Sequence, residues 1–245
     1  MIKGFVLAIQ FLTRLPVNIS IDFNDENIRR STFFYPFVGI LLGALSALPY
    51  YFLGTYNRSI ASFLTVMLMI ILTGGLHLDG LSDTADGFFS NKDKEKTLEI
   101  MKDSRIGAFG VLSLILIILL KYILISNMEL NVPITLILSM GNGRLIVLLQ
   151  IALKKVARPG GLGDMLHSSK PKKYILGGSV LYIILIAFIN IKYLIPLIGS
   201  FIIGELISLY TYRKIDGFTG DIYGATIEII EAISLLIFWG VNLWI

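Results

Sequence analysis

The chain has 245 residues and a mass of 27.3 kDa, a length that ordinarily suggests one or two soluble domains. Its composition excludes that class, because 55% of the residues are hydrophobic and only 16% are charged, against about 45–50% and about 25% in soluble domains. The net charge is +4, and the absence of cysteine excludes disulfides, thiolate metal sites and a cysteine nucleophile. Much of the surface must therefore face lipid, and we expect one membrane-embedded domain over residues 1–245.

The N-terminal segment is apolar but is interrupted by polar residues and has no small-residue cleavage site, so we expect no cleaved signal peptide. On a helical wheel Lys3, Gln10 and Arg14 lie opposite Phe5 and Ile9. This pattern is typical of a short amphipathic helix that lies in the membrane interface. The sequence predicts such an interfacial helix before the first membrane span.

Seven stretches are long and apolar enough to cross a bilayer. They are residues 33–53, 59–76, 107–126, 132–153, 174–191, 193–212 and 225–245. The shortest of them, at 1.5 Å per residue, spans about 27 Å, close to the hydrocarbon core of about 30 Å. Each segment must satisfy its own backbone hydrogen bonds in lipid, so helices follow. The sequence predicts an all-α, polytopic membrane helix bundle of about seven transmembrane helices.

The basic residues orient these spans. With the N-terminus on side one, 17 of the 21 Lys and Arg residues fall in connections on that side, and only Arg58 and Lys192 fall on the other. The side-one connections are residues 1–32, 77–106, 154–173 and 213–224. Cytoplasmic loops carry an excess of Lys and Arg, so side one is expected to be cytoplasmic. We therefore expect a multi-pass protein of the cytoplasmic (inner) membrane whose active site faces the cytoplasm.

The most unusual stretch, residues 74–87, follows the second span and carries three aspartates. In a helix, Asp79, Asp83 and Asp86 have i, i+4 and i+7 spacing and share one face within about 60°. Three stacked anions repel one another unless a cation neutralises them, and oxygen ligands without thiolates suit Mg²⁺. The alternative is a solvated acidic turn. His77 projects away from the aspartate face, so we expect a structural hydrogen-bonding role for it.

Two basic segments are candidates for binding phosphate. Lys102, Ser104 and Arg105 precede the third span, where backbone N–H groups at a helix N-terminus favour anions. The alternative is a set of anchoring residues at the membrane surface. Arg158 begins a second, glycine-rich segment, residues 158–164, which has the flexibility to close over an anion.

Several charged residues fall inside predicted spans. Arg144 lies in the fourth span, where an unpaired guanidinium costs about 2.5 kcal/mol or more, so we expect it to be paired or to bind phosphate. Asp221, Glu228 and Glu231 follow one helical stripe at the start of the last span, and Glu205 lies in the sixth. These acids need partners, and Arg144 and a metal ion are the available ones. Alternatively, some of them are paired only for packing.

These motifs together resemble the cobalamin synthase family, the adenosylcobinamide-GDP ribazoletransferases. The matching segments, in family order, are Phe11 to Pro16, Tyr35 to Gly39, His77 to Gly87, Asp103 to Gly107, Arg158 to Gly163 and Thr219 to Glu231. They extend over essentially the whole chain, and the His77 and Thr219 segments are the most specific. The chain departs from the expected pattern in having Asp216-Gly217-Phe218 where a Gly-Gly approach to Thr219 is expected.

The resemblance implies a Mg²⁺-dependent enzyme that joins adenosylcobinamide-GDP to α-ribazole or its 5′-phosphate and releases GMP, late in cobalamin biosynthesis. It implies these two substrates and the lipid bilayer as partners and no nucleic acid, and it leaves a homo-oligomer open. The metal candidates are Asp79, Asp83, Asp86 and Asp221, and Asp221 or Glu228 completes the metal site or accepts the hydroxyl proton. The phosphate candidates are Lys102, Ser104, Arg105, Arg144 and Arg158.

Two other functions deserve comparison. CDP-alcohol phosphotransferases also combine a polytopic helix bundle with a multi-aspartate metal site, but the segment after Asp79-Gly80 lacks their Ala-Arg pair. An ion-coupled transporter would use Glu205, Glu228 and Glu231 as its ion path. Transporters often contain paired repeats with sites at the midplane, whereas this sequence shows no internal symmetry and its acids crowd the cytoplasmic side.

Overall fold

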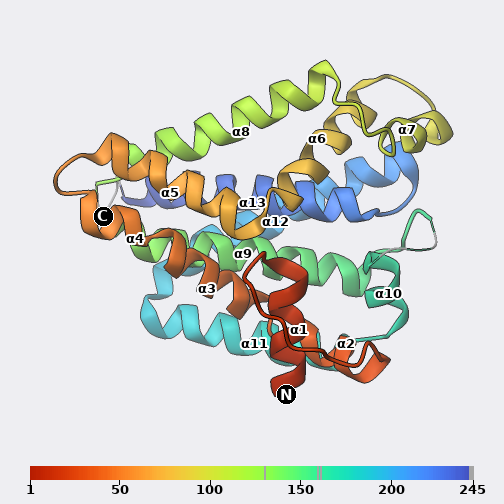
Figure 1. The fold of residues 1–245 in the computed structure, drawn as a ribbon, viewed down its shortest axis with the longest axis horizontal. Helices are drawn as coiled ribbons and strands as arrows, with labels where there is room; N and C mark the ends of the chain where they lie inside the picture. Colours follow the sequence, from red (N-terminus) through yellow and green to blue (C-terminus); the bar gives the residue numbers. More distant parts are fainter. Residues whose placement is uncertain (130, 159, 161, 243–245) are drawn as a thin grey trace.

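A computed structural model describes residues 1–129, 131–158, 160 and 162–242. These residues form a bundle of α-helices, shown in Figure 1. The helices are α1 (Ile2–Leu12), α2 (Asp25–Thr32), α3 (Tyr35–Ser46), α4 (Leu48–Leu53), α5 (Arg58–Thr73), α6 (Leu76–Phe89), α7 (Lys94–Ile100), α8 (Ala108–Ser126), α9 (Val132–Leu153), α10 (Leu162–Ser168), α11 (Lys172–Ile189), the 3₁₀ helix η1 (Ile191–Tyr193), α12 (Leu194–Ile215) and α13 (Gly220–Asn242). The predicted all-α fold is confirmed.

The described chain contains six helical segments that are long and apolar enough to cross a membrane, or seven if the bent pair α5 and α6 counts as one span. The six are Tyr35–Leu53, Ala108–Ser126, Val132–Leu153, Lys172–Ile189, Ile191–Ile215 and Gly220–Val241. The last of them begins five residues earlier than the predicted 225–245, and residues 243–245 lie outside the described chain. The polytopic membrane bundle is therefore confirmed.

The second predicted span, 59–76, is interrupted. Helix α5 ends at Thr73 because Gly74 and Gly75 both adopt positive φ angles, of 63° and 71°, which are open to glycine at little cost. Helix α6 then begins at Leu76 and bends by 89° from α5. If α5 crosses the membrane, α6 runs nearly parallel to the membrane plane, outside the spanning helices.

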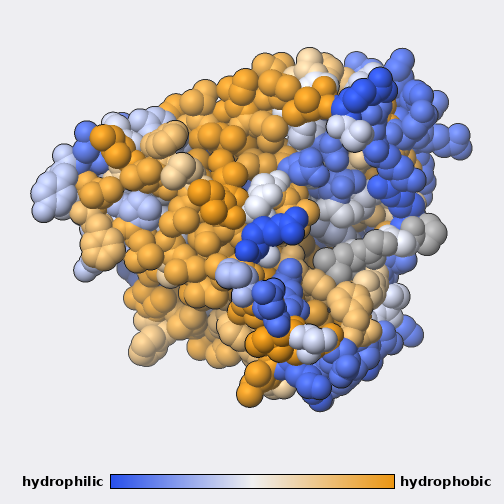
Figure 2. All heavy atoms as spheres, viewed as in Figure 1, coloured by the Kyte–Doolittle hydropathy of each residue, from blue (hydrophilic) through white to orange (hydrophobic). Residues whose placement is uncertain are grey.

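The outer surface is apolar in the way that lipid contact requires. Large side chains such as Phe63, Leu116 and Phe188 are exposed on helices α5, α8 and α11. Figure 2 shows hydrophobic residues over the middle of this face and a hydrophilic region around the end where α7 lies. In a soluble protein such an extended apolar surface would cause aggregation, whereas in a bilayer it matches the solvent.

Helix α9 packs against α3 along a line of small residues. A Cβ atom at Gly39 of α3 would lie 2.5 Å from the carbonyl oxygen of Met140, and one at Gly43 would lie 2.5 Å from Cα of Ile137. Both approaches are far inside van der Waals contact, so only glycine permits them. Glycines four residues apart are typical of close helix contacts in membranes, where packing replaces the hydrophobic effect.

The N-terminal helix α1 is short and apolar, as predicted. It packs against α2 and α3 and lies across the front of the bundle in Figure 1. Within α1, the side chains of Leu7, Ala8 and Leu12 are buried, whereas that of Ile2 is exposed. Its placement in the membrane interface stays a prediction.

The tight α3–α9 contact predicts the effect of added volume. We expect Gly43→Ala to lower the free energy of unfolding by about 1–3 kcal/mol, because the new methyl group must push α9 away. Gly240→Ala is the matched control, since a Cβ there meets nothing within 4 Å. Unfolding in detergent, followed by circular dichroism, measures both variants. Equal stability of the two would contradict the close packing.

Candidate active site

The two acidic motifs meet where α6 crosses α13. A Cβ atom at Gly80 would lie 2.6 Å from the carbonyl oxygen of Asp221, and one at Gly224 would lie 3.3 Å from the backbone of His77. Because neither glycine has a side chain, the two helices touch backbone to backbone. Asp79 and Asp221, 142 positions apart in the chain, consequently line the same cavity.

The aspartate face of α6 forms as the sequence predicted. Asp79, Asp83 and Asp86 all lie within the helix, and Asp79 is exposed to solvent. Partial burial, together with the charges of Asp79, Asp221 and Asp86, raises the pKa of Asp83 to about 6. Since the charges of the other three aspartates contribute to this shift, the four carboxylates form one local cluster, which we call the acid cluster.

Asp86 differs from the other carboxylates because it contacts a helix N-terminus. One of its oxygens accepts a hydrogen bond from the backbone N–H of Gly107 at 2.7 Å, and the other from Gly110 at 2.8 Å. Gly107 is the N-cap residue of α8 and Gly110 lies in its first turn, where the sequence suggested a phosphate cradle. The structure corrects that expectation in part, because a carboxylate of the same chain already binds these two donors.

Lys102, Ser104 and Arg105 are exposed in the loop that leads into α8. The Arg105 guanidinium is 86% exposed and donates to both carboxylate oxygens of Asp103, at 3.0 and 3.2 Å from Nε and 2.5 Å from Nη2. This contact lowers the pKa of Asp103 to about 2. The loop therefore lies beside Asp86, but Arg105 points to solvent and pairs locally, and its phosphate role stays a prediction.

Arg158 does reach the acid cluster. The backbone N–H of Phe218 donates to the Lys155 carbonyl at 2.9 Å, and the N–H of Ala157 donates to the Phe218 carbonyl at 2.8 Å, which ties this loop to the start of α13. Nη2 of Arg158 lies 3.7 Å from an Asp221 carboxylate oxygen, and its buried Nη1 has no partner within the described chain. Pro159 and Gly161 of the predicted loop lie outside the described residues.

Thr219 explains why α13 begins at Gly220. Its hydroxyl accepts a hydrogen bond from the backbone N–H of Ile222 at 3.4 Å and donates to the Asp221 carboxylate at 3.2 Å. Threonine at this position satisfies a free donor of the first turn, and an acid in that turn interacts favourably with the helix dipole. The Thr-Gly-Asp motif thus fixes both the helix start and the orientation of Asp221.

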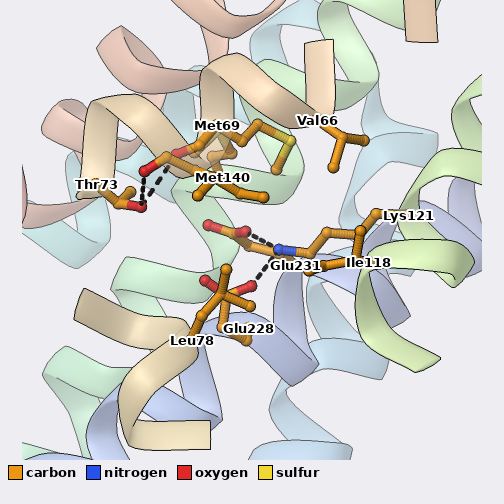
Figure 3. Close-up of a pocket in the computed structure, with 10 residues that line it drawn as sticks. Val66, Met69, Thr73, Leu78, Ile118, Lys121, Met140, Glu228 and Glu231 are labelled. Carbon is orange, nitrogen blue, oxygen red and sulfur yellow. Dashed lines mark hydrogen bonds and ion pairs between the residues drawn. The ribbon is translucent and has the colours of Figure 1, made fainter. Parts of the chain in front are cut away.

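Glu228 and Arg144 belong to a second, buried charge cluster. Lys121 on α8 donates to Glu228 at 2.6 Å and to Glu231 at 2.5 Å, as Figure 3 shows. Arg144 is fully buried and pairs with the other Glu231 oxygen. Two cations and two carboxylates therefore balance inside the bundle, which is what a low-dielectric site requires.

This cluster corrects two sequence predictions. Arg144 was a phosphate candidate, but its exposed fraction is zero and its partner is Glu231, so no substrate phosphate reaches it. Glu228 was a metal or proton-accepting candidate, but its carboxylate is buried and bound to Lys121. The signal that sequence reasoning missed was Lys121, a lone lysine in the apolar third span. Glu205 also has a partner, since Lys154 donates to it at 2.6 Å.

The acid cluster borders a cavity of about 230 Å³. Aromatic and aliphatic side chains from α1, α3, α9 and α13 form much of its wall, and Asp79 and Asp221 are among its lining residues. His77 and Tyr223 also line it, and neither was predicted to do so. His77 was expected to make a structural hydrogen bond, but its buried Nε2 has no partner among the described residues.

The carboxylates provide the oxygen ligands that Mg²⁺ prefers, but they do not form a closed cage. Across residues 1–129, 131–158, 160 and 162–242, no three His, Asp or Glu side chains converge closely enough to hold a metal ion alone. Mg²⁺ usually binds one or two carboxylates and completes its shell with water and substrate phosphates. The donors therefore fit a Mg²⁺ ion that arrives with a phosphorylated substrate.

Comparison with known proteins decides the family. The family described as "Cobalamin-5-phosphate synthase" matches residues 4–239. The chain belongs to the cobalamin-5-phosphate synthase family.

Curated members of this synthase family align along nearly their whole length. The "Adenosylcobinamide-GDP ribazoletransferase" of Treponema denticola is 39% identical, with 94% of each chain covered. The protein with the same name from Clostridium botulinum strain Langeland is 39% identical and covers 96% of this chain and 97% of its own, and that of Thermoanaerobacter pseudethanolicus is 39% identical with 99% of both covered. No solved structure matches this synthase.

The buried cluster predicts a large cost for removing one charge from this synthase. We expect Lys121→Met to lower the free energy of unfolding by about 3–5 kcal/mol, because it leaves an uncompensated carboxylate inside the bundle. The double variant Lys121→Met with Glu228→Gln should recover much of that loss. Thermal unfolding of the purified protein in detergent measures both.

Lys154→Met is the matched control, because Lys154 also pairs with a glutamate but at a partly exposed site, where the side chains are 18% and 40% exposed. Its expected cost is within about 1 kcal/mol. If the two lysine variants lose equal stability, the Lys121 cluster does not have the energetic role assigned to it.

Proposed function

We propose that this synthase is an adenosylcobinamide-GDP ribazoletransferase, which transfers the phosphocobinamide group to α-ribazole or its 5′-phosphate and releases GMP. The observation that carries the proposal is the full-length similarity to proteins of that name. The acid cluster at the α6–α13 crossing supports it. Phosphoryl transfer needs positive charge next to the bound diphosphate, and carboxylates can hold the cation that supplies it.

We assign Asp79, Asp83 and Asp221 to Mg²⁺. We leave Asp86 out of the metal site because both of its carboxylate oxygens already accept hydrogen bonds from the start of α8. Bound there with the substrate, Mg²⁺ would neutralise negative charge on the diphosphate and on the transferring group. Burial and the charges of Asp79, Asp221 and Asp86 raise the pKa of Asp83, so a cation bound among these carboxylates would offset their mutual repulsion.

The chain's own residues position the reacting groups. Arg158, 3.7 Å from Asp221, is placed to bind a phosphate oxygen beside the carboxylates. The ribazole 3′-hydroxyl attacks the phosphorus that carries cobinamide, forming a new P–O bond while the P–O bond to GMP breaks. In this proposal Asp221 either completes the metal site or accepts the hydroxyl proton, and the leaving GMP keeps the bonding electron pair.

We also propose that the protein lies in the cytoplasmic membrane with this site facing the cytoplasm. The support is the distribution of basic residues, 17 against 2, between the two sets of connections. Helix α6 lies toward the end of the bundle where α7 and α10 lie (Figure 1), in the two connections richest in basic residues, so in this orientation cytoplasmic nucleotides would reach the acid cluster.

Asp83→Asn tests the proposed function. Purified wild type with adenosylcobinamide-GDP, α-ribazole and Mg²⁺ should release GMP, and the variant should lose at least about 100-fold in kcat, because one metal-binding charge is gone. GMP release is measured by chromatography. Asp25→Asn, an exposed change at the start of α2, is the control and should retain wild-type rates.

No GMP release by the wild type across several detergents and lipids would refute the transferase assignment. Normal turnover by Asp83→Asn would instead remove Asp83 from the metal site and leave the assignment of the family untouched.

The raised pKa of Asp83 gives the proposed metal binding a pH dependence. Mg²⁺ must displace a proton from Asp83 wherever that carboxyl is protonated, below about pH 6. Apparent Mg²⁺ affinity should therefore be flat above pH 7 and fall by about tenfold per pH unit below pH 6. Asp86→Asn should shift the break to lower pH, because it removes one charge that raises the pKa of Asp83 without removing an assigned metal ligand. Mg²⁺ titration of thermal stability from pH 5 to 8 measures this.

A further inference from the structure

We propose that the cavity beside Asp79 and Asp221 is the binding site for the benzimidazole base of α-ribazole, with His77 as the residue that hydrogen-bonds the base. This inference rests on the proposed function and adds the substrate half that the cavity takes. Phe11, Leu12, Tyr35, His77, Leu166 and Tyr223 are the side chains that define it.

The volume of the cavity limits which part of the two substrates can bind in it. Its volume of about 230 Å³ lies below the roughly 300–1,000 Å³ of pockets that enclose whole drug-sized ligands. The corrin ring is far larger than that, so it must lie elsewhere. A flat bicyclic base fits the available space.

The chemistry of the cavity wall favours dimethylbenzimidazole, the base of α-ribazole, over guanine, the base of adenosylcobinamide-GDP. Phe11 and Leu12 from α1, Leu166 from α10 and Ile227 from α13 present apolar surface, and Val147 lies on the α9 side. The described polar groups on this wall are few: His77 Nε2, the unpaired hydroxyls of Tyr35 and Tyr223, and the two aspartates. Guanine carries polar groups along most of its edge, and burying them against the apolar part of the wall would leave some of them without partners. Dimethylbenzimidazole carries two methyl groups and no exocyclic polar group, so it matches an apolar wall.

The free ring nitrogen of the benzimidazole also has a hydrogen-bond partner in this cavity, the side chain of His77. Attached to ribose through one ring nitrogen, the benzimidazole keeps a single free ring nitrogen that accepts a hydrogen bond. His77 is 5% exposed, lines the cavity, and its Nε2 has no hydrogen-bond partner among the described residues. Buried polar atoms in proteins are nearly always paired with protein, water or ligand, so this nitrogen is available to a hydrogen-bonding group bound in the cavity. An N–H at this atom would donate to the free ring nitrogen.

The position of the acids orients the rest of the nucleoside. Asp79 is exposed and Asp221 is partly exposed, and both line the same cavity, so they mark its open side. A base buried against α1 and α9 leaves its ribose at this opening. The ribose hydroxyl then lies next to the carboxylates to which the proposed chemistry assigns the diphosphate and the proton.

The larger apolar groove of the described chain does not offer the same match. It lies between α5 and α8, has a volume of about 660 Å³ and is lined by residues such as Phe63 and Leu119 that the apolar outer surface also presents. Its only polar side chains are those of Ser59 and Tyr122. It borders none of the aspartates of the acid cluster, so a nucleoside bound there would be out of reach of the reacting groups.

The free base tests the site on the intact protein. With wild-type protein in detergent, 5,6-dimethylbenzimidazole should inhibit GMP release competitively with respect to α-ribazole and not with respect to adenosylcobinamide-GDP. Unmethylated benzimidazole should inhibit at least about tenfold more weakly, because each methyl group fills apolar space. Inhibition that is not competitive with α-ribazole would overturn the inference.

Two substitutions separate the base pocket from a general effect on folding. Leu12→Ala enlarges the cavity, so the KM for α-ribazole should rise at least about fivefold while the KM for adenosylcobinamide-GDP stays within twofold. Leu119→Ala on the lipid-facing groove is the matched control and should change neither KM. A change confined to the cobinamide substrate would refute the proposed site.

His77→Phe keeps an aromatic ring but removes the donor, and should raise the KM for α-ribazole by about three- to tenfold. His77→Gln retains an N–H donor and should recover part of that loss, which a purely structural role would not predict. Wild type that fails to release GMP refutes the proposed function and this inference together. Normal turnover with an unchanged KM in both His77 variants refutes the role of His77 alone.

Discussion

The site of this synthase depends on one backbone contact, the crossing of α6 and α13 at Gly80 and Gly224. At Gly80 a side chain of even one carbon would collide with the Asp221 carbonyl, so the crossing tolerates no Cβ there. The contact brings Asp79 beside Asp221 and makes both line one cavity. The break at Gly74-Gly75 supports it, because only after the 89° bend does α6 run across α13 instead of continuing the path of α5. Glycines thus determine where the charges meet.

The charged residues form two clusters, one buried and neutralised within the bundle and one open to solvent at the α6–α13 crossing. Inside the bundle, Lys121 and Arg144 balance Glu228 and Glu231, so the acids there are fully compensated and structural. At the crossing, Arg158 lies 3.7 Å from Asp221, and within the described chain no salt bridge joins Asp79 or Asp83 to a basic residue, while the pKa of Asp83 is raised. Uncompensated charge is tolerated near solvent and is costly in lipid. This contrast separates residues that hold the fold from residues available to a cation and a substrate.

Much of the local structure was predictable. The Asp79–Asp83–Asp86 spacing correctly indicated a helical face, and the long apolar runs correctly indicated membrane helices. Sequence reasoning failed where a residue's role depended on a partner far away in the chain. It left Arg144 either paired or bound to phosphate, and could not choose between these because its partner Glu231 lies 87 positions away in the chain. It missed His77 for a similar reason, since the wheel position of a side chain says nothing about the cavity that another helix builds around it.

The sequence by itself determined that this protein is an all-α membrane bundle, because hydrophobic length and backbone hydrogen bonding in lipid leave no other solution. It also determined the family, through motifs that extend over the whole chain. Only the tertiary structure decided which charged residues neutralise one another and which remain open to ligands. The physical reason is that the energy of a charge depends on the distance to its partners and on its exposure to water. Both quantities are set by helix packing and neither is written in the order of residues.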